Sequence, residues 1–535
     1  MHGTIACMTP FDLIVVGAGH NGLVTAAYVA KAGYKVLVLE RRDVLGGCCV
    51  TENLWPGYKV STASYVNSLF RPQIIKALDL KKHGFQMLPR NPSSFTPFPD
   101  GRHLLMGPDA ALNHREISKF SAKDADALPK YEAMLLRVAD FLEPQLEETP
   151  PDPWSVGLGN LWQLGQLALK FRRLGRDGVD AVEILTGAAR PILDRWFESE
   201  QLKITLATDA VIGVMAAPSM PGTAYVLFHH VMGECDGARG VWGYVRGGMG
   251  ALSEAIAASA KSFGAQVRTS AAVNRILTKN GAACGVALAD GTEIAAKAVA
   301  SCADANVTFL KLMEPKELPE QFVADIRAID YTSASLKINC AVKELPNFSA
   351  LPGVALGPQH RGTIHLCPTF DYMEQAYDDA KYGRPSRSPI IEMTIPTSVD
   401  DSLAPPGMHV VSMFVQYAPY HLREGNWDDF KESFADRCCD IVNEYAPNFK
   451  QSVVHRQVIS PLDLERTFGL TGGNIFQGNM SLSRMFFLRP AAGYANYRTP
   501  IQGLYLCGAA THPGGGVMGA CGLNAAREIL KDGIR

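Results

Sequence analysis

The chain has 535 residues, of which 47% are hydrophobic and 19% charged, as in soluble globular proteins of two or three domains. Its 51 basic and 53 acidic residues give a net charge of −2 without a basic run interleaved with aromatics, which argues against nucleic acid as a partner. The 12 cysteines are scattered and show no C-x-x-C spacing, so we expect a reducing compartment, no metal and no dithiol motif.

The first ten residues, Met1 to Pro10, contain no apolar segment and no Arg. We therefore expect neither a secretory signal nor a transit peptide, and a cytoplasmic location. No apolar run reaches the roughly 20 residues that a membrane-spanning helix needs.

Regular structure begins with a βαβ unit. Residues 11–16 (Phe-Asp-Leu-Ile-Val-Val) have the apolar run of a buried parallel strand. An Ala-rich helix follows from about Asn21 to Ala32, Gly33 ends it, and residues 35–39 form a second strand. This order predicts a parallel sheet covered by helices.

A glycine motif joins the first strand to the helix, and it consists of Gly17, Ala18, Gly19, His20, Asn21 and Gly22. Gly17 permits the tight turn, Gly19 lets the backbone approach a pyrophosphate, and Gly22 lets the helix pack on the strand. The helix N-terminus offers free N–H groups to phosphates, and we expect His20 beside them. Glu40 ends the second strand, where an acidic residue accepts ribose hydroxyls. The motif therefore predicts a dinucleotide site.

The residues that follow favour FAD over NAD. The motif continues as Glu-Arg-Arg-x-x-x-Gly-Gly through Arg41, Arg42, Gly46 and Gly47, an extension typical of FAD sites. Cys48 follows this turn, where we expect the chain to run by the pyrophosphate, and small groups for a flavin face come later, at Thr62, Ala63 and Ser64. For the last three, an ordinary polar turn is an equal alternative.

The middle of the chain is mixed. Residues 110–150 are helical in pattern, residues 247–305 alternate between helix and strands, and residues 330–345 and 388–418 alternate like sheet strands.

One segment of the middle is apolar with a basic flank. Residues 153–169 hold no charge, and Lys170, Arg172, Arg173 and Arg176 follow. This pattern suits a helix that lies on a membrane or caps a lipophilic tunnel. A helix packed on a substrate domain or in a dimer contact has the same pattern, so both readings of 154–175 stay open.

The C-terminal segment supplies a third part of the flavin site. A strand at 504–507 leads into a Gly-rich loop and a helix from about Gly519 to Lys531. A helix N-terminus directed at a flavin ring stabilises its anionic reduced form. The expected contacts are Gly508, Ala509, Val517, Met518 and Gly519.

Three segments resemble the phytoene desaturase branch of FAD-dependent flavoproteins, which includes flavin-type carotenoid ketolases and belongs to a wider amine-oxidase-like group. They are 17–47; 65–97, with Leu69-Phe70-Arg71-Pro72-Gln73 and Arg90-Asn91-Pro92; and 463–522, with Leu488-Arg489-Pro490, Tyr497-Arg498-Thr499-Pro500 and Thr511-His512-Pro513-Gly514. The resemblance spans nearly the whole chain.

The resemblance implies an α/β fold, with a Rossmann-like FAD-binding domain of the glutathione-reductase type and a discontinuous α+β substrate domain. The FAD-binding domain is expected at 1–70, 235–310 and 485–535. The substrate domain is expected at 71–234 and 311–484, with an apolar lid or membrane-facing segment at 154–175. Val273 is implied to meet the adenine, Cys302 and Ala303 to lie near the ribose, and Met518 and Gly519 near the isoalloxazine.

Two features depart from the resemblance, the absence of a dithiol motif and the residue after the glycine of the last strand. Many relatives have Asp after the glycine of the last strand, where this chain has Ala509. Gly247-Gly248-Met249-Gly250 precedes a helix but matches the second flavin-domain segment, so we expect no separate NADPH domain. The electron partner stays open between oxygen, a quinone and another flavoprotein.

The flavin is expected to carry the redox chemistry while the protein orients the substrate. His512 is the candidate for proton handling, because the Gly-rich loop would bring an imidazole that titrates near neutrality close to the ring. A histidine that only packs the loop is the alternative. Arg489 is expected to pair with an anionic substrate or the flavin, or to form a structural ion pair.

These observations predict an FAD-dependent desaturase, saturase or oxidase that acts on an apolar substrate by hydride transfer. A binding or regulatory flavoprotein with structural FAD and an amine oxidase are the alternatives. A homodimer and peripheral membrane contact stay open. The resemblance also leaves open a mitochondrial matrix location, if the chain is imported like the protein it resembles.

Overall fold

The computed structural model describes residues 11–235 and 237–534. Residues 1–10, on which the expectation about leader segments rests, lie outside the described residues.

The first sheet carries the N-terminal motif and has seven strands among the described residues. Its strands are β1 (Phe11–Val16), β2 (Val36–Leu39), β11 (Gln266–Arg268), β12 (Val273–Lys279), β13 (Ala282–Leu288), β14 (Glu293–Ser301) and β20 (Leu504–Leu506). The order is β11-β2-β1-β14-β13-β12, and β20 also pairs with β14. β1 is parallel to β2 and β14, and every side chain of β2 is buried, as the apolar pattern of a sheet covered on both faces predicts.

Three helices pack around the first sheet: α1 (His20–Lys31), α10 (Gly250–Ser262) and α16 (Ala520–Asp532). α1 contacts both others, because its many alanines allow the helices to approach closely. The Thr25 hydroxyl of α1 donates to the carbonyl of Gly522 in α16 at 3.0 Å. The C-terminal helix is thus bound directly to the first one.

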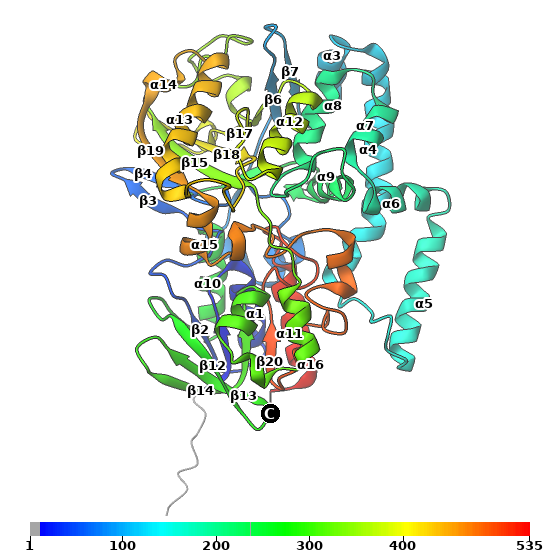
Figure 1. Ribbon diagram of the computed structural model, residues 1–535, viewed down its shortest axis with the longest axis vertical. Helices are drawn as coiled ribbons and strands as arrows, with labels where there is room; N and C mark the ends of the chain where they lie inside the picture. Colours follow the sequence, from blue (N-terminus) through cyan, green and yellow to red (C-terminus); the bar gives the residue numbers. More distant parts are fainter. Residues whose placement is uncertain (1–10, 236, 535) are drawn as a thin grey trace, which may run out of the picture.

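The second sheet lies at the opposite end of the molecule (Figure 1) and has the order β19-β15-β18-β17-β16-β6-β7. Its strands are β6 (Ser94–Pro97), β7 (His103–Met106), β15 (Ser335–Val342), β16 (Thr363–Leu366), β17 (Ile390–Thr394), β18 (His409–Gln416) and β19 (Val453–Ile459). α13 (Trp427–Tyr445) packs on it through Trp427, Phe434 and Val442. The sheet forms a second apolar core.

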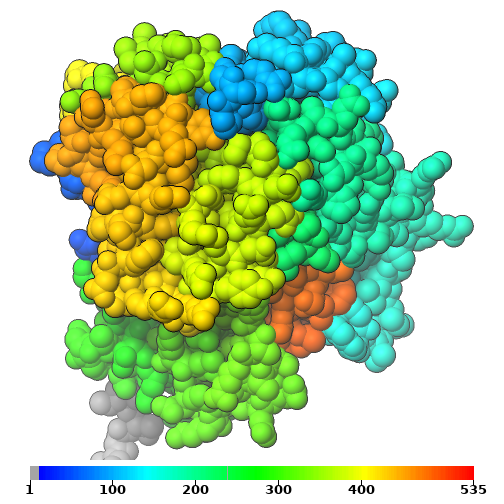
Figure 2. Space-filling model, turned by 45° about the horizontal axis from the view of Figure 1, so that its top comes forward, coloured from blue at the N-terminus to red at the C-terminus, as the bar shows by residue number. Residues whose placement is uncertain are grey.

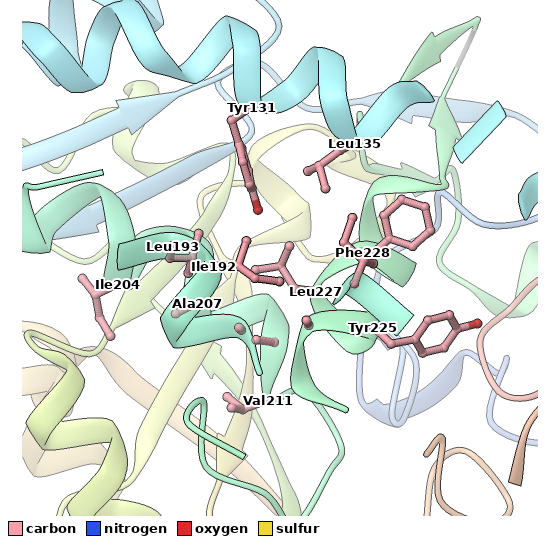
Figure 3. Close-up of a cluster of buried hydrophobic side chains, with 14 of the residues drawn as sticks. Tyr131, Leu135, Ile192, Leu193, Ile204, Ala207, Val211, Tyr225, Leu227 and Phe228 are labelled. Carbon is pink, nitrogen blue, oxygen red and sulfur yellow. The ribbon is translucent and has the colours of Figure 1, made fainter. Parts of the chain in front are cut away.

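A layer of helices adjoins the second sheet (Figures 1 and 2). It consists of α3 (Ala110–Ser118), α4 (Ala122–Leu142), α6 (Asp177–Thr186), α7 (Ala189–Trp196), α8 (Glu200–Ala207) and α9 (Thr223–Val231). Apolar side chains from α4, α7, α8 and α9 point toward one another, among them Leu135, Leu193 and Phe228 (Figure 3).

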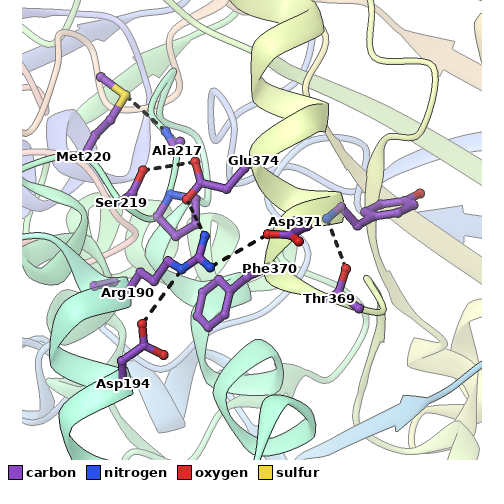
Figure 4. Close-up of polar contacts among 12 residues, drawn as sticks. Arg190, Asp194, Ala217, Ser219, Met220, Thr369, Phe370, Asp371 and Glu374 are labelled. Atoms are coloured by element: carbon purple, nitrogen blue, oxygen red, sulfur yellow. Dashed lines mark hydrogen bonds and ion pairs between the residues drawn. The ribbon is translucent and has the colours of Figure 1, made fainter.

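Arg190 joins this helical layer to α12 (Phe370–Lys381). Its guanidinium on α7 lies 3.5 Å from Glu374 and 3.8 Å from Asp371 (Figure 4), and it also covers the ring of Phe370. The side chain is about a third exposed, so solvent screening keeps each ion pair weak.

The remaining elements connect these layers. They are β3 (Glu52–Trp55), β4 (Tyr58–Val60), β5 (Met87–Pro89), β8 (Glu234–Cys235), β9 (Ala238–Arg239), β10 (Gly243–Val245), α2 (Pro72–Ala77), α5 (Leu158–Arg173), α11 (Glu320–Arg327), α14 (Phe449–Ser452) and α15 (Pro461–Phe468). Among the described residues, no helix is long and apolar enough to span a membrane.

The structure confirms the predicted α/β class and the first βαβ unit, with strand 11–16 at the expected bounds. The strands of the first sheet come from three separate stretches of the chain, and those of the second sheet from the segments between them. The boundaries expected for the two domains stay a prediction.

Candidate functional site

A cavity of about 900 Å³ extends from the glycine turn after β1 to the second sheet and the helical layer. Its first end is walled by Gly17, Glu40 and Arg42, and its far end by residues such as Tyr131, Lys337 and Glu392. We call these the nucleotide end and the distal end. A single cavity therefore joins the predicted dinucleotide site to the second sheet.

The glycine turn at the nucleotide end has no space for larger side chains. Gly17 has a φ of +94°, which other residues rarely adopt. A Cβ at Gly22 would lie 2.3 Å from the carbonyl oxygen of Gly17. Gly19 precedes the first turn of α1, and no side chain caps the helix there. The N–H groups of that turn are thus available to a bound anion.

Glu40 is fixed at the end of β2 and is 6% exposed. One carboxylate oxygen accepts the N–H of Ala18 at 2.8 Å, and the other accepts the N–H of Arg42 at 3.0 Å. A carboxylate has about four acceptor sites, so two bonds leave capacity for ribose hydroxyls.

The two arginines after Glu40 have different partners. Arg41 donates to the carbonyls of Arg466 and Thr467, at the C-terminal end of α15. Arg42 pairs with Glu52 at 2.6 Å, and its guanidinium lies over the ring of Phe468. Nη1 of Arg42 is buried without a hydrogen-bond partner in the described part of the chain. Such a donor suits an acceptor that a ligand brings.

The thiol of Cys48 lines the cavity, and that of Cys49 donates to the carbonyl of Met249 at 3.2 Å. Burial raises the pKa of Cys48 to about 12 and that of Cys49 to about 11. Both therefore stay protonated at neutral pH, which disfavours thiolate chemistry.

The C-terminal loop forms another wall through Ala509, Gly516 and Val517. Arg489 holds this loop, since Nε and Nη2 donate to the carbonyl of Ala509 and Nη1 donates to the carbonyl of Asn479. The structure places Arg489 on backbone carbonyls, with no carboxylate in an ion pair with it among the described residues. The structural ion pair is therefore not found among the described residues, and pairing with a substrate or the flavin stays a prediction.

His512 does not line the cavity. It is 1% exposed, its Nε2 lies 2.8 Å from the carbonyl oxygen of Gln145, and burial lowers its pKa to about 4. The loop turns this ring toward the segment after α4. The geometry favours the packing alternative over proton handling, for which His512 stays an untested candidate.

Most of the predicted cofactor residues line one cavity: Gly17, Gly19, His20, Asn21, Glu40, Arg41, Arg42, Gly46, Gly47, Cys48, Ala63, Ser64, Val273, Cys302, Ala303, Ala509 and Val517. Ala18, Gly22, Thr62, Gly508, Met518 and Gly519 lie behind this wall. Thr62, for example, donates to Glu52.

These residues fit FAD. The glycine turn admits a close ligand, Glu40 keeps free acceptor sites, and Arg42 has an unused donor facing the same cavity. The volume is that of a large organic ligand site. The glycine turn, Glu40 and Arg42 would hold the nucleotide half, and the wall of Ala63, Ser64 and Val517 would hold the ring half.

Among the ionisable side chains at the distal end, which the sequence analysis did not assign to a site, are Arg90, Asp209, Lys337 and Glu392, here called the charge cluster. Arg90, Lys337 and Glu392 are between 2% and 8% exposed. Lys337 and Glu392 belong to β15 and β17, whose side chains are all buried. A charged residue inside an otherwise apolar strand was the signal that could have identified them.

The two cations of the charge cluster have neutral partners. Nζ of Lys337 donates to the Ser412 hydroxyl and lies 3.6 Å from the ring centre of Tyr65. Burial lowers the pKa of Lys337 well below its usual value. Arg90 donates to the Thr363 hydroxyl at 2.6 Å and to the carbonyl of Trp242 at 3.3 Å.

The two carboxyls differ in their partners, since the side chain of Tyr65 forms a hydrogen bond with Glu392. Neither Asp209 nor Glu392 forms an ion pair within 4 Å among the described residues. Burial raises the pKa of each to about 7, although Arg90 opposes this shift, and Asp209 raises the pKa of Glu392 further. Near neutral pH these groups can therefore bind or release a proton.

Apolar side chains line the distal end beside the charge cluster. Leu128, Tyr131 and Leu135 of α4 line the cavity together with Leu227 and Phe414. The distal end is thus an apolar chamber with ionisable groups on one wall. No group of His, Cys, Asp or Glu in the described ranges could hold a metal ion.

Comparison with known proteins places the chain among flavoproteins. The family described as flavin containing amine oxidoreductase matches residues 22–530. Pyridine nucleotide-disulfide oxidoreductase domain-containing protein 2 of Rattus norvegicus is 48% identical over 99% of this chain and 95% of its own length. The lycopene-forming phytoene desaturase of Pseudescherichia vulneris is 25% identical over 95% and 96%. An oxidoreductase structure from Methanosarcina mazei has 16% identity and a TM-score of 0.59, covering 97% and 99% of the two chains. These findings confirm the family resemblance and the amine-oxidase-like fold.

Proposed function

The chain belongs to the flavin containing amine oxidoreductase family, and we propose that its substrate is a lipophilic molecule with one polar, hydrogen-bond-donating group. The protein is an FAD-dependent oxidoreductase. When bound, FAD supplies hydride acceptance or donation. The chain's own residues bind the cofactor, orient the substrate and exclude water.

The observation that carries the proposal is the lining of the distal end. Leu128, Leu135 and Phe414 offer apolar contact, and burying a carbon chain against them favours binding by about 25 cal/mol per Å². Asp209 and Glu392 form no direct ion pair among the described residues, although the charge of Arg90 acts on both. A substrate donor at this wall would satisfy them and fix the carbon chain in one direction.

Amine oxidation is the second candidate, and the carboxyl pair favours it. A cationic amine beside Asp209 and Glu392 would lower their pKa values further than Arg90 already does.

Anaerobic mixing tests both candidates. Bound flavin should lose its visible absorbance with a long-chain amine or alcohol, while the unsubstituted hydrocarbon of equal length should react far more slowly. Preference for the amine would select the second candidate. A protein that binds these compounds without flavin reduction would contradict both and support a binding or regulatory role with structural FAD.

Glu392→Gln provides the matched variant for this screen. It keeps the side-chain shape but removes the ionisable acceptor, so KM for the polar substrate should rise by about tenfold or more. The variant Glu293→Gln, on an exposed position of β14, should leave KM unchanged. Equal KM values for both variants would overturn the role given to the charge cluster.

The electron partner, the location and the assembly of the protein are also part of the proposal. The electron partner is oxygen, a quinone or another flavoprotein, and titration of the reduced protein with each distinguishes them. We also keep the cytoplasm as the proposed location, with the mitochondrial matrix as the alternative, and a homodimer as an open assembly.

A further inference from the structure

α5 directs apolar side chains toward solvent. Leu158, Leu161, Trp162 and Leu169, here called the apolar stripe, are 87%, 50%, 67% and 49% exposed. Their spacing puts them on one helix face. In a surface helix this face normally packs on the core, but no residue of α5 is buried. Figure 1 shows α5 at the edge of the molecule, outside the helical layer.

The charged residues of α5 itself are all basic, while Glu147, Glu148 and Glu528 line a groove together with Trp162 and Lys170. Lys170, Arg172, Arg173 and Arg176, here called the basic end, follow the stripe, and no Asp or Glu occurs from residue 153 to 176. The next carboxylate, Asp177, is already paired with Arg137 of α4 at 3.0 Å. The basic end makes no ion pair within the described part of the chain. Its natural partner is therefore an anion from outside.

We propose that α5 docks on an anionic phospholipid surface. The apolar stripe enters the boundary between headgroups and acyl chains, and the basic end binds lipid phosphates. Trp162 lies in the stripe and Trp154, 59% exposed, precedes the helix. Tryptophan is the residue that favours this boundary, because its ring is apolar and its N–H is polar.

A second copy of the chain fits this surface less well. Pairing two apolar stripes would bring two basic ends into one interface without an acidic residue from either segment. Like charges in an interface oppose association. A lipid surface provides both missing components, an apolar layer and fixed negative charge.

The docking surface is linked to the cavity through α4. Phe171 of α5 contacts Phe141 of α4, with ring centres 5.8 Å apart. The same α4 supplies Leu128, Tyr131 and Leu135 to the cavity wall. Delivery of a lipophilic substrate from the membrane would follow, a consequence that rests on the proposed function, whereas docking itself does not.

Vesicle flotation of the full-length, FAD-loaded protein tests docking without an activity readout. The probes are vesicles of phosphatidylcholine alone and of phosphatidylcholine with about one-third phosphatidylglycerol. We expect binding only to the second. Arg172→Glu with Arg173→Glu should weaken it by about tenfold or more, since each basic residue contributes roughly 1 kcal/mol near an anionic surface.

A second variant replaces Leu161, Trp162 and Leu169 with Ser, and it should also lose binding without loss of thermal stability, because these side chains are exposed. Lys81→Glu with Lys82→Glu, both exposed, is the matched charge control and should bind like the parent protein. Absent binding of the parent to anionic vesicles, or retained binding in both α5 variants, overturns the proposal. So does a dimer in sedimentation velocity that the Ser variant converts to a monomer, because a second copy then occupies the stripe.

Discussion

Arg489 donates two hydrogen bonds to the carbonyl oxygen of Ala509, from Nε at 3.0 Å and from Nη2 at 2.8 Å. The same Nη2 also donates to the carbonyl of Phe476 at 2.6 Å. One buried cation thus fixes the loop that forms a wall of the cavity. Burial lowers the pKa of Arg489 without a counter-charge nearby, so its stability depends on these carbonyl contacts.

We therefore expect Arg489→Lys to destabilise the protein, because an ammonium cannot reproduce the planar set of donors. Leaving buried carbonyls without donors costs about 1–3 kcal/mol each. The unfolding temperature should fall, and FAD should be released at a lower temperature. Differential scanning fluorimetry with flavin fluorescence measures both, and Arg484→Lys, which has one bond to Ala328, is the control. An unchanged flavin release would show that the loop needs no such anchor.

Glu40→Ala should weaken FAD retention by about tenfold or more. The loss combines charge-assisted bonds to ribose hydroxyls, worth about 1.5–3 kcal/mol, with the two backbone bonds that shape the turn. The ratio of flavin to protein after gel filtration measures it. Glu293→Ala, on the exposed part of β14, serves as control. Full flavin occupancy in Glu40→Ala would count against this assignment.

Glu392 should make stability depend on pH in the direction opposite to that of a salt-bridged carboxylate. Its pKa in the folded protein is about 7, above the value of about 4.3 in an unfolded chain. Between these values the folded state holds a proton that the unfolded state has released. The contribution of Glu392 to the free energy of unfolding is therefore highest below about pH 4, falls as the pH rises to about 7, and is constant above that pH.

Replacing Glu392 with Gln removes the loss of stability that deprotonation of Glu392 causes. Relative to the parent protein, Glu392→Gln should gain up to about 3 kcal/mol at pH 8 compared with pH 4. Thermal unfolding at the two pH values gives the difference, with Glu293→Gln as control. An equal effect at both pH values would mean that Glu392 has an ordinary pKa.

We expect no NAD(P)H-dependent disulfide reductase activity. The thiols of Cys48 and Cys49 have raised pKa values. At the start of α10 the N–H of Gly250 donates to Thr51, that of Met249 to Ser61 and that of Gly247 to Asp400, so side chains already take the donors that a second nucleotide would need.

Stopped-flow mixing with NADH and NADPH tests this expectation. The flavin spectrum should not change within the time of turnover. Rapid flavin reduction, followed by disulfide turnover that Cys48→Ser abolishes, would refute it.

The nucleotide end of the cavity could be predicted from the sequence because its main elements lie close together in the chain. β1, the glycine turn, α1 and Glu40 lie within the first 40 residues, and each has a recognisable period or composition. The side chains of His512 and Arg489 could not be placed in this way, since their partners Gln145 and Ala509 are set by tertiary packing.

The charge cluster was missed for the same reason. Its members come from four distant segments, and only the strand order β15-β18-β17 brings Lys337 and Glu392 into one sheet. A charged residue within an apolar strand, such as Lys337 in β15, was a local indication in the sequence. The other members of the charge cluster lie far away in the sequence, so their proximity could not be predicted. For α5, the sequence indicated the apolar segment and its basic flank. Whether the apolar side chains pack on the protein or face solvent could be decided only from the structure.

The pairing of β20 with β14, next to β1, also affects how the protein is made. The first strand leaves the ribosome early, whereas its sheet gains β20, and α1 gains α16, only when the last residues have been synthesised. A nascent chain must therefore keep the apolar side of α1 uncovered through most of translation. The wall that the C-terminal loop gives to the cavity is therefore completed only after almost the whole chain has been synthesised.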